Sequence, residues 1–331
     1  MNKSMLKDRI WGIWCSLPHS RINQKKALIK RWINIALGQS VTAVKQGEGK
    51  YYDKDEIKGY YNDLTGKLNG TVLDENGIPL TEIAEGEMVY FPIAIFQYGL
   101  AAYDAYLDSK SRAYLLEFKN IANWAVENQK PDGSWDAFGP MKSRKYSVSS
   151  MCQGEGASLL FRAAKQFRNE KYKNQAFSAI DFMLRPVDEG GTSIYEEGRS
   201  YLEEYPESPR RSVLNGWIFS IFGLYDAMLE MPDKYTPAFN QTLDTLCNDV
   251  LFYDRGFWSL YDRKGKIASP AYHDLHIALL EVLFSLTGRR ELQIAARKFK
   301  GYRRKKLCKL KAVLIKIIQK LKEDSDVVTV K

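Results

Sequence analysis

The chain has 331 residues, of which 45% are hydrophobic and 27% charged, which is typical of a globular protein. This composition excludes a disordered, collagen-like or small disulfide-rich protein. The net charge of +9 comes from the end of the chain. Residues 297–322 contain twelve Lys or Arg and no acidic residue, and residues 323–331 carry a charge of −2, which leaves −1 for residues 1–296. A nearly neutral body argues against nucleic-acid binding, because such proteins line their binding face with basic residues.

The cysteines and the apolar runs indicate a protein of a reducing compartment. The four cysteines lie far apart and none has the spacing of a zinc ligand pair, so we expect free thiols. No apolar run reaches the roughly 20 residues of a membrane span, and the short apolar stretch 10–17 lacks a clear cleavage site. The sequence therefore predicts a cytoplasmic protein. The cysteines are Cys15, Cys152, Cys247 and Cys308.

Residues 1–90 are expected to form a helical and small β segment. Apolar residues near helical spacing predict a helix within residues 1–45. Residues 71–80 predict two extended pieces joined by a turn over Asn76-Gly77.

From residue 92 the pattern becomes a repeated pair of helices, the first more apolar than the second. Such pairs, recurring every 50–60 residues, are typical of an inner and an outer ring. The sequence predicts a mainly α fold, an α/α toroid of about four helix hairpins, over residues 91–300. The expected helices are 93–106, 111–129, 155–167, 174–184, 213–229, 237–251, 273–286 and 291–298.

The connections between successive pairs are polar and aromatic, and we expect them to meet at one end of the toroid, where loops on a rigid scaffold carry function. In residues 201–217, two carboxylates and a phenol precede two prolines and two arginines. An exposed polar loop is the alternative. A second group is Tyr261-Asp-Arg-Lys264 followed by Tyr272-His-Asp-Leu-His276. Its two histidines are neighbours on a helix face, but a third ligand is lacking, so we predict no metal site.

The segment Met151-Cys-Gln-Gly-Glu-Gly-Ala-Ser158 has two glycines around an acid. No convincing strand precedes it, so a dinucleotide-binding loop is excluded by context. The start of a closely packed inner helix is the better interpretation, with Gln153 and Glu155 facing the centre.

Six motifs occur in a fixed order and together resemble the C-terminal catalytic region of the heparosan (D-glucuronyl) C5-epimerases, over about residues 85–290. They are Tyr90–Leu100, Gln153-Gly154, Glu203-Glu-Tyr-Pro206 with Val213-Leu-Asn-Gly216, Gly223-Leu-Tyr-Asp226, Tyr261-Asp262 and Tyr272-His-x-x-His276. The resemblance implies an α/α toroid whose catalytic group contains three tyrosines and a glutamate. By motif these match Glu204, Tyr205, Tyr261 and Tyr272.

Two departures stand out. Animal members carry an arginine three residues after the middle tyrosine, where this chain has Lys264, with Arg263 one step earlier. Residues 1–90 are too short for the full β-barrel domain of those members.

The resemblance implies C5 epimerisation of D-glucuronyl residues in a uronic-acid-containing polysaccharide, heparosan-like or a bacterial capsule or exopolysaccharide. A proton leaves C5 and returns on the opposite face, while charge develops on the carboxylate and needs a cation or donor. A free tyrosine with a pKa of about 10 is a poor base. Cations from Arg263, Lys264, His273 or His276 are expected to favour phenolate, and Glu204 would orient a phenol or accept the proton. No cofactor is needed, since the reaction involves no net redox change.

The binding residues are expected to include amides and one cation that pairs with the sugar carboxylate, chosen from Arg210, Arg211, Arg263 and Lys264. A uronate lyase or glycoside hydrolase on the same fold remains an alternative, as does a non-catalytic glycan-binding toroid. The predicted substrate-binding set is Tyr90, Gln97, Gln153, Arg210, Asn215, Arg263, Lys264, His273 and His276.

Residues 301–331 are expected to form a basic amphipathic helix and tail. This helix either packs on the toroid or attaches the protein peripherally to the anionic face of an inner membrane. A homodimer is left open as an assembly. The apolar positions are Leu307, Leu310, Val313, Leu314, Ile317, Ile318 and Leu321.

Overall fold

The protein is described by a computed structural model over residues 45–83, 86–140 and 145–322. The helix expected within residues 1–45, with Cys15, and the acidic end of the chain lie outside the described residues.

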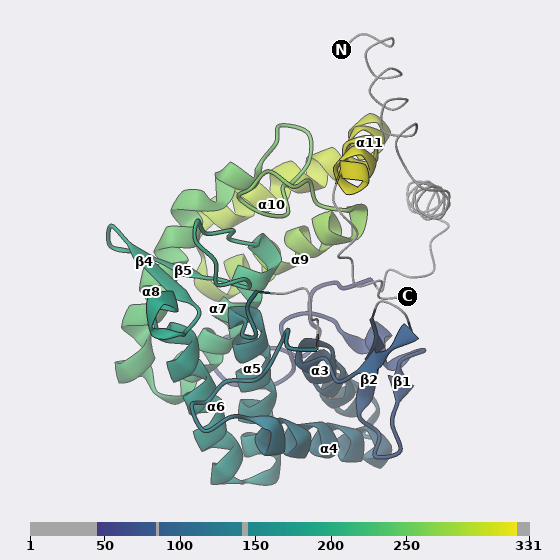
Figure 1. The fold of residues 1–331 in the computed structure, drawn as a ribbon, viewed down its shortest axis with the longest axis vertical. Helices are drawn as coiled ribbons and strands as arrows, with labels where there is room; N and C mark the ends of the chain where they lie inside the picture. The colour runs from purple at the N-terminus through teal and green to yellow at the C-terminus, as the bar shows by residue number, and fades with distance from the viewer. Residues whose placement is uncertain (1–44, 84–85, 141–144, 323–331) are drawn as a thin grey trace.

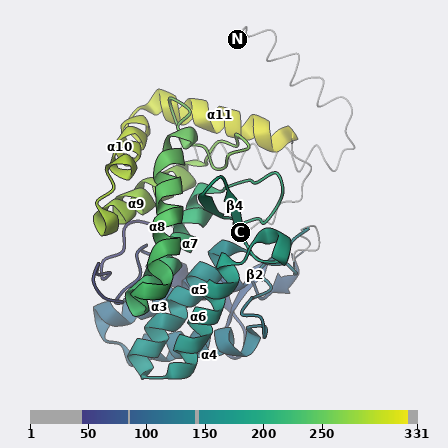
Figure 2. The ribbon, with the colours of Figure 1, turned by 90° about the vertical axis from the view of Figure 1, so that its left-hand side faces the viewer.

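Four helix hairpins follow one another from residue 92, so the predicted mainly α fold with an α/α toroid arrangement is confirmed (Figures 1 and 2). The inner helices α3, α5, α7 and α9 contact each other in chain order, and each packs on the outer helix that follows it. The hairpins are α3 (Pro92–Ser109) with α4 (Arg112–Asn128), α5 (Ser150–Phe167) with α6 (Glu170–Leu184), α7 (Leu214–Glu230) with α8 (Pro232–Asp249), and α9 (Pro270–Thr287) with α10 (Arg290–Arg303).

The inner helices are apolar nearly all round because they are covered on every side. In α7 every residue from Leu214 to Ala227 is buried, whereas the outer helices bury a single stripe. Two glycines let α5 and α7 approach closely, since a Cβ on Gly223 would lie 2.4 Å from the carbonyl oxygen of Gly154. The predicted interpretation of the glycine run as a helix start is therefore correct, and α5 begins five residues earlier than expected.

The described part of the N-terminal segment closes one end of this arrangement. Residues 51–61 cross the C-terminal halves of all four inner helices, and we call this the closed end. Their rings belong to the same hydrophobic core as the helices. The contacts are Tyr60 N to Asp104 Oδ1 at 2.9 Å, Arg162 Nη2 to Gly59 O at 3.0 Å, Tyr225 OH to Lys54 O at 2.6 Å and Tyr52 OH with Ser285 Oγ at 2.9 Å.

Short β elements flank the helices. The predicted turn over Asn76-Gly77 joins β1 (Val72–Leu73) to β2 (Pro79–Glu82), and β3 (Met88–Val89) completes an antiparallel sheet. Gly77 takes a φ of +77°, which favours glycine. A second hairpin, β4 (Ser193–Glu196) and β5 (Arg199–Leu202), lies in a region that the sequence analysis treated as loop. Single-turn 3-10 helices complete the elements: η1 (Thr65–Leu68), η3 (Val187–Glu189) and η4 (Val250–Tyr253).

The predicted basic helix near the C-terminus is present as α11 (Lys306–Lys322). It packs on residues 257–268, where Trp258, Ile267, Ala268 and Ala312 form a small second core. Among the described residues, no helix is both long and apolar enough to span a membrane.

Candidate active site

The loops that enter the inner helices meet at the end opposite the closed one, as predicted. The segments before α7 and α9 pair through an antiparallel bridge between Val213 and Asp262. Leu214 N donates to Tyr261 O at 3.1 Å, and Arg263 N donates to Arg211 O at 3.0 Å. We call this the open end. The pairing fixes how the side chains of the two loops face each other.

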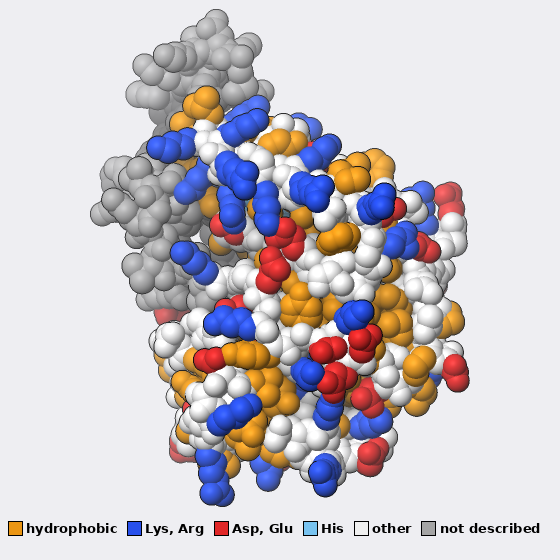
Figure 3. All heavy atoms as spheres, turned by 180° about the vertical axis from the view of Figure 1, so that it is seen from behind, with side chains coloured by type: hydrophobic (Ala, Val, Ile, Leu, Met, Phe, Trp, Pro, Cys, Tyr) orange, Lys and Arg blue, Asp and Glu red, His pale blue; other side chains and the backbone are white. Residues whose placement is uncertain are grey.

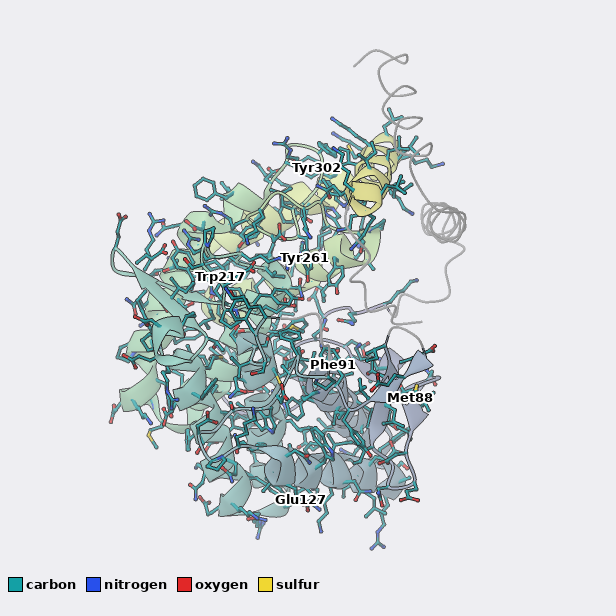
Figure 4. All side chains as sticks on the ribbon, in the orientation of Figure 1. Met88, Phe91, Glu127, Trp217, Tyr261 and Tyr302 are labelled. Atoms are coloured by element: carbon teal, nitrogen blue, oxygen red, sulfur yellow. The ribbon has the colours of Figure 1, made fainter. Side chains whose placement is uncertain are left out.

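Four of the predicted residues come together at the open end with an arginine between them. The Arg211 Cζ lies 4.6 Å from the ring centroid of Tyr205 and 6.0 Å from that of Tyr261. The rings of Tyr261 and Tyr272 meet edge to face, with centroids 5.0 Å apart. Glu204 is near enough to raise the pKa of both Tyr261 and Tyr272. We call these five residues the tyrosine cluster; Figure 4 labels Tyr261 among the loops above α5 and α7.

Buried groups fix the position of the cluster. Asp262, which is fully buried, accepts from Arg211 Nε at 2.9 Å. The carboxylate of Glu203 accepts from the backbone N of Ser212 at 2.7 Å and of Arg211 at 3.2 Å. Glu204 rests on the first turn of α7, where a Cβ on Gly216 would lie 2.4 Å from its Oε2. The backbone of residues 203–216 therefore determines where the acid and the guanidinium point.

Two phenols of the cluster are held in the protonated form. Desolvation, followed by the charge of Glu204, raises the pKa of Tyr272 to about 12 and that of Tyr261 further above its usual range. Tyr272 nevertheless exposes 41% of its surface, so it is accessible from solvent. The expectation that nearby cations favour phenolate at these two positions is wrong, because desolvation and the charge of Glu204 outweigh the effect of the neighbouring Arg211.

The two histidines also differ from that expectation. Desolvation lowers the pKa of His273 to about 4 and that of His276 to about 3, so neither is a cation at neutral pH. Both Nδ1 atoms contact Ser259 Oγ, at 2.8 and 3.0 Å, and the ring of His273 stacks on Trp258 at 3.7 Å. Both side chains are fully buried and support the loop that carries Tyr261.

The predicted amides lie inside the helical layer. Gln153 bonds three backbone groups, those of Gly133, Trp135 and Ala179, and is fully buried. This side chain ties α5 to its neighbours.

The other two amides are also buried, and one of them contacts a buried acid. Gln97 Nε2 donates to Glu155 Oε1 at 2.8 Å. Desolvation raises the pKa of Glu155 to about 8, so this acid is mostly protonated at neutral pH. Asn215 is buried at the start of α7.

The predicted cations other than Arg211 have acidic partners outside the tyrosine cluster. Arg210 pairs with Glu196 of β4 at 3.0 Å, and Arg263 pairs with Asp249 of α8 at 2.9 Å. Lys264 pairs with Glu207 at 2.6 Å, two residues beyond Tyr205.

The Tyr90 side chain has its contacts outside the tyrosine cluster. Its hydroxyl donates to Asp74 at 2.8 Å beside the three-stranded sheet, and its ring lies near Trp124 of α4.

Two residues at the open end were not predicted. Phe138 stacks on Tyr205 with centroids 5.2 Å apart, and the Lys316 Nζ of α11 lies 5.7 Å from the Tyr261 ring. An aromatic residue in a polar loop was a usable signal for the first. No local signal pointed to Lys316, because its neighbours lie some 50 residues away in the chain.

In the part of the chain that the structure covers, neither a metal site nor the one cavity described coincides with the tyrosine cluster. Within the described ranges, no three His, Cys, Asp or Glu side chains gather as a metal site requires. A cavity of about 380 Å³ lies elsewhere, beside Lys50, Asp104 and Asp108, near the closed end.

Comparison with known proteins identifies the family. The model of the D-glucuronyl C5-epimerase C-terminus matches residues 132–301, just over half of the chain. The chain belongs to this family. The matched range includes every residue of the tyrosine cluster and ends before α11. Within the D-glucuronyl C5-epimerase family, a protein of Caenorhabditis elegans named D-glucuronyl C5-epimerase is 29% identical over 214 residues, which cover 56% of this chain and 34% of that protein. The chain thus spans about a third of the length of that relative.

Solved structures give more distant likenesses to this epimerase-family chain. Unsaturated glucuronyl hydrolase from Bacillus sp. GL1 aligns with a TM-score of 0.44 and 16% identity, over 63% of this chain and 60% of the hydrolase. PssZ from Listeria monocytogenes aligns with a TM-score of 0.36 and 12% identity, over 81% of this chain and 97% of PssZ. Neither likeness is close enough to bear on function.

Proposed function

We propose that this chain catalyses C5 epimerisation of D-glucuronyl residues in a uronic-acid-containing polysaccharide. The observation that carries the proposal is the tyrosine cluster, in which one acid, three phenols and one guanidinium lie together at the open end. Family membership supports the reaction type. A heparosan-like polymer or a bacterial capsular polysaccharide is the expected substrate.

Arg211 would stabilise the negative charge that develops on the uronate carboxylate. Removing the C5 proton leaves an electron pair that delocalises onto the uronate carboxylate. A cation that can donate two parallel hydrogen bonds stabilises this intermediate most strongly. Arg211 already lies between the rings of Tyr205 and Tyr261, whereas Arg210 and Arg263 have acidic partners elsewhere.

The acid and base roles follow from the surroundings of each phenol. Tyr272 keeps its proton, because its pKa is raised to about 12, and would supply that proton to C5. The Arg211 cation lies 4.6 Å from the ring centroid of Tyr205, where it would balance the negative charge that a base must carry. Tyr205, with its own proton passed to Glu204, would accept the proton of a D-glucuronyl C5. One proton leaves one face and another arrives on the opposite face, so the net change is inversion.

The anionic polymer also suits the electrostatics of the open end. The N-termini of α5, α7 and α9 are directed there, and helix N-termini favour negative charge. Subsites for the neighbouring sugars would include exposed polar side chains of the same loops.

The test is isotope exchange and product analysis in D2O with a desulfated uronate polymer. We expect wild-type protein to incorporate deuterium at C5 and to form L-iduronyl residues. Tyr205→Phe should lower both by at least about 100-fold. Tyr272→Phe should still exchange deuterium with retention but form no L-iduronyl residues.

The matched control is Tyr195→Phe on β4, which removes a hydroxyl that donates to Leu184 O at 2.7 Å, outside the tyrosine cluster, and it should leave both rates unchanged. Wild-type inversion by Tyr205→Phe or Tyr272→Phe would overturn the assignment. An unsaturated product that absorbs in the ultraviolet would instead identify the chain as a lyase.

A further inference from the structure

The two sides of α11 have different surroundings. One side is built into the loop that carries Tyr261: Lys316 Nζ donates to Ile267 O at 2.8 Å, and Gln319 Oε1 accepts from Ile267 N at 2.9 Å. Ala312 and Val313 are buried on the same side. The predicted packing of this helix on the toroid is therefore correct for this side.

The opposite side of the first half of α11 is an exposed apolar stripe. Leu307, Leu310 and Leu314 follow i, i+3, i+7 spacing and expose 81%, 52% and 52% of their surface. Nine residues separate Leu307 from Lys316, which at 3.6 residues per turn puts them on opposite sides of the helix. Three leucines so exposed in a row mark an interaction surface.

Basic side chains surround this stripe. Arg303, Arg304, Lys305 and Lys306 lead into it, and Lys311 lies beside Leu310. No acidic residue of the described part of the chain pairs with Arg304, Lys305 or Lys306. In Figure 3, basic side chains gather at the upper end of the molecule, where α10 and α11 lie, with apolar ones between them.

We propose that the outward side of α11 docks onto an anionic lipid membrane surface. A leucine stripe flanked by uncompensated Lys and Arg matches both properties of such a surface, which is apolar below its headgroups and negatively charged at them. An anionic polysaccharide or nucleic acid would use the charges but would leave the leucines in water. Because Lys316 on the other side contacts the Tyr261 loop, docking would hold the open end close to the membrane.

Point substitutions test this better than truncation. Deleting α11 would also remove Lys316 and Gln319 from the Tyr261 loop and so confound folding with binding. The triple variant Leu307→Ser/Leu310→Ser/Leu314→Ser changes only the outward side. Leu116→Ser/Leu251→Ser is the matched control, because these leucines are 54% and 47% exposed on α4 and η4.

Co-sedimentation is measured with vesicles of phosphatidylcholine alone and with added phosphatidylserine, in the absence of any polysaccharide. We expect the full chain to bind only the phosphatidylserine vesicles and to dissociate as salt rises. The triple leucine variant should bind at least about 10-fold more weakly. Each of Arg304→Gln, Lys305→Gln and Lys306→Gln should weaken binding about fivefold, and the control pair should bind as wild type.

Four results would overturn the proposal. The first is no vesicle binding by the full chain, and the second is unchanged binding by the triple leucine variant. The third is a melting temperature of the triple variant more than about 5 °C below that of wild type. The fourth is a wild-type dimer that becomes a monomer in the triple variant. The third result would show that the chain itself covers the stripe, and the fourth that a second copy does. Vesicle binding is read without turnover, so it succeeds or fails independently of the epimerase proposal.

Discussion

The closed and open ends of the helical layer each hold an arginine that pairs with an aspartate and lies over two tyrosine rings. At the closed end, Arg162 pairs with Asp226 at 2.6 Å and lies 5.3 and 5.2 Å from the rings of Tyr60 and Tyr61. Both members of the ion pair are at most 1% exposed. Tyr61 OH and Ser158 Oγ also donate to Asp226, at 2.7 and 2.5 Å.

At the open end the same residue types have a different setting. Arg211 pairs with Asp262 at 2.9 Å, but its side chain is 15% exposed. Its two rings, those of Tyr205 and Tyr261, belong to chain segments that enter helices at the surface. The closed group has all its partners within the protein, whereas the open group can be approached by a ligand. Residue type alone therefore does not separate a structural ion pair from one proposed to bind substrate; burial and access do.

The largest expected difference concerns the closed end. Asp226→Ala leaves Arg162 buried and unpaired, which should lower the free energy of unfolding by about 3–5 kcal/mol. Urea denaturation measures this. Asp244→Ala is the control, because it breaks an exposed pair with Arg289 and should cost under about 1 kcal/mol. Similar losses in the two variants would contradict a special role for the closed-end pair.

The matching change at the open end should affect activity more than stability. Arg211→Gln is expected to lower C5 deuterium exchange by about 100-fold or more and the free energy of unfolding by about 1–2 kcal/mol. Arg263→Gln is the control in the loop that pairs with the Arg211 loop, and Asp249 would keep its contact with Arg199. If the control loses as much exchange as Arg211→Gln, the guanidinium of Arg211 has no particular role.

His273 and His276, which support the Tyr261 loop, should make a pH-dependent contribution to the free energy of unfolding. His273 and His276 titrate near 6.5 when unfolded and near 4 and 3 when folded, so below pH 6.5 the unfolded state binds more protons. Between pH 6.5 and 5 the two rings should therefore lower the free energy of unfolding by about 2 kcal/mol each. Burial raises the pKa of Glu155 to about 8 and that of Asp104 to about 7, and these two carboxyls act in the opposite direction, so the contribution of a ring is measured by comparing variants.

The readout is urea denaturation of wild type and His276→Gln at the two pH values. On going from pH 6.5 to 5, His276→Gln should lose about 2 kcal/mol less than wild type. The same pH dependence in both proteins would contradict the buried, neutral state of the pair.

The smallest effect should come from Gly216→Ala. The added Cβ would meet Glu204 Oε2 at 2.4 Å, so the carboxylate must move. We expect about tenfold slower exchange and a loss of roughly 1 kcal/mol in unfolding free energy. Gly301→Ala, with open space around its Cβ, is the control. Normal exchange in Gly216→Ala would show that the exact place of Glu204 is unimportant.

Much of the fold could be predicted because its helices bury regular patterns. The inner helices are apolar all round and the outer helices have a single apolar stripe. Both patterns can be recognised directly in the sequence. The β4–β5 hairpin was missed because its strands are four residues long and lie in a polar segment. Its turn, Glu197-Gly198, takes positive φ at both residues. The flanking residues do not alternate between apolar and polar, so the sequence did not predict a hairpin around this turn.

The site was predictable only where motifs carried it. The ordered motifs pointed to Glu204, Tyr205, Tyr261 and Tyr272, which the fold places together. Choosing Arg211 over its neighbour Arg210 required three-dimensional information. Successive residues of an extended segment point to opposite sides, and their partners come from distant elements. The Gln153 side chain forms hydrogen bonds with three backbone groups, and these contacts could not be predicted from the sequence.

The most direct test of the account is the structure of the protein with a bound uronate oligosaccharide. We expect one sugar carboxylate to accept hydrogen bonds from Arg211, with C5 of that sugar lying between the hydroxyls of Tyr205 and Tyr272, each at about 3–3.5 Å. An oligosaccharide bound instead in the cavity beside Asp104 and Asp108, with Arg211 unoccupied, would contradict the assignment of the open end as the active site.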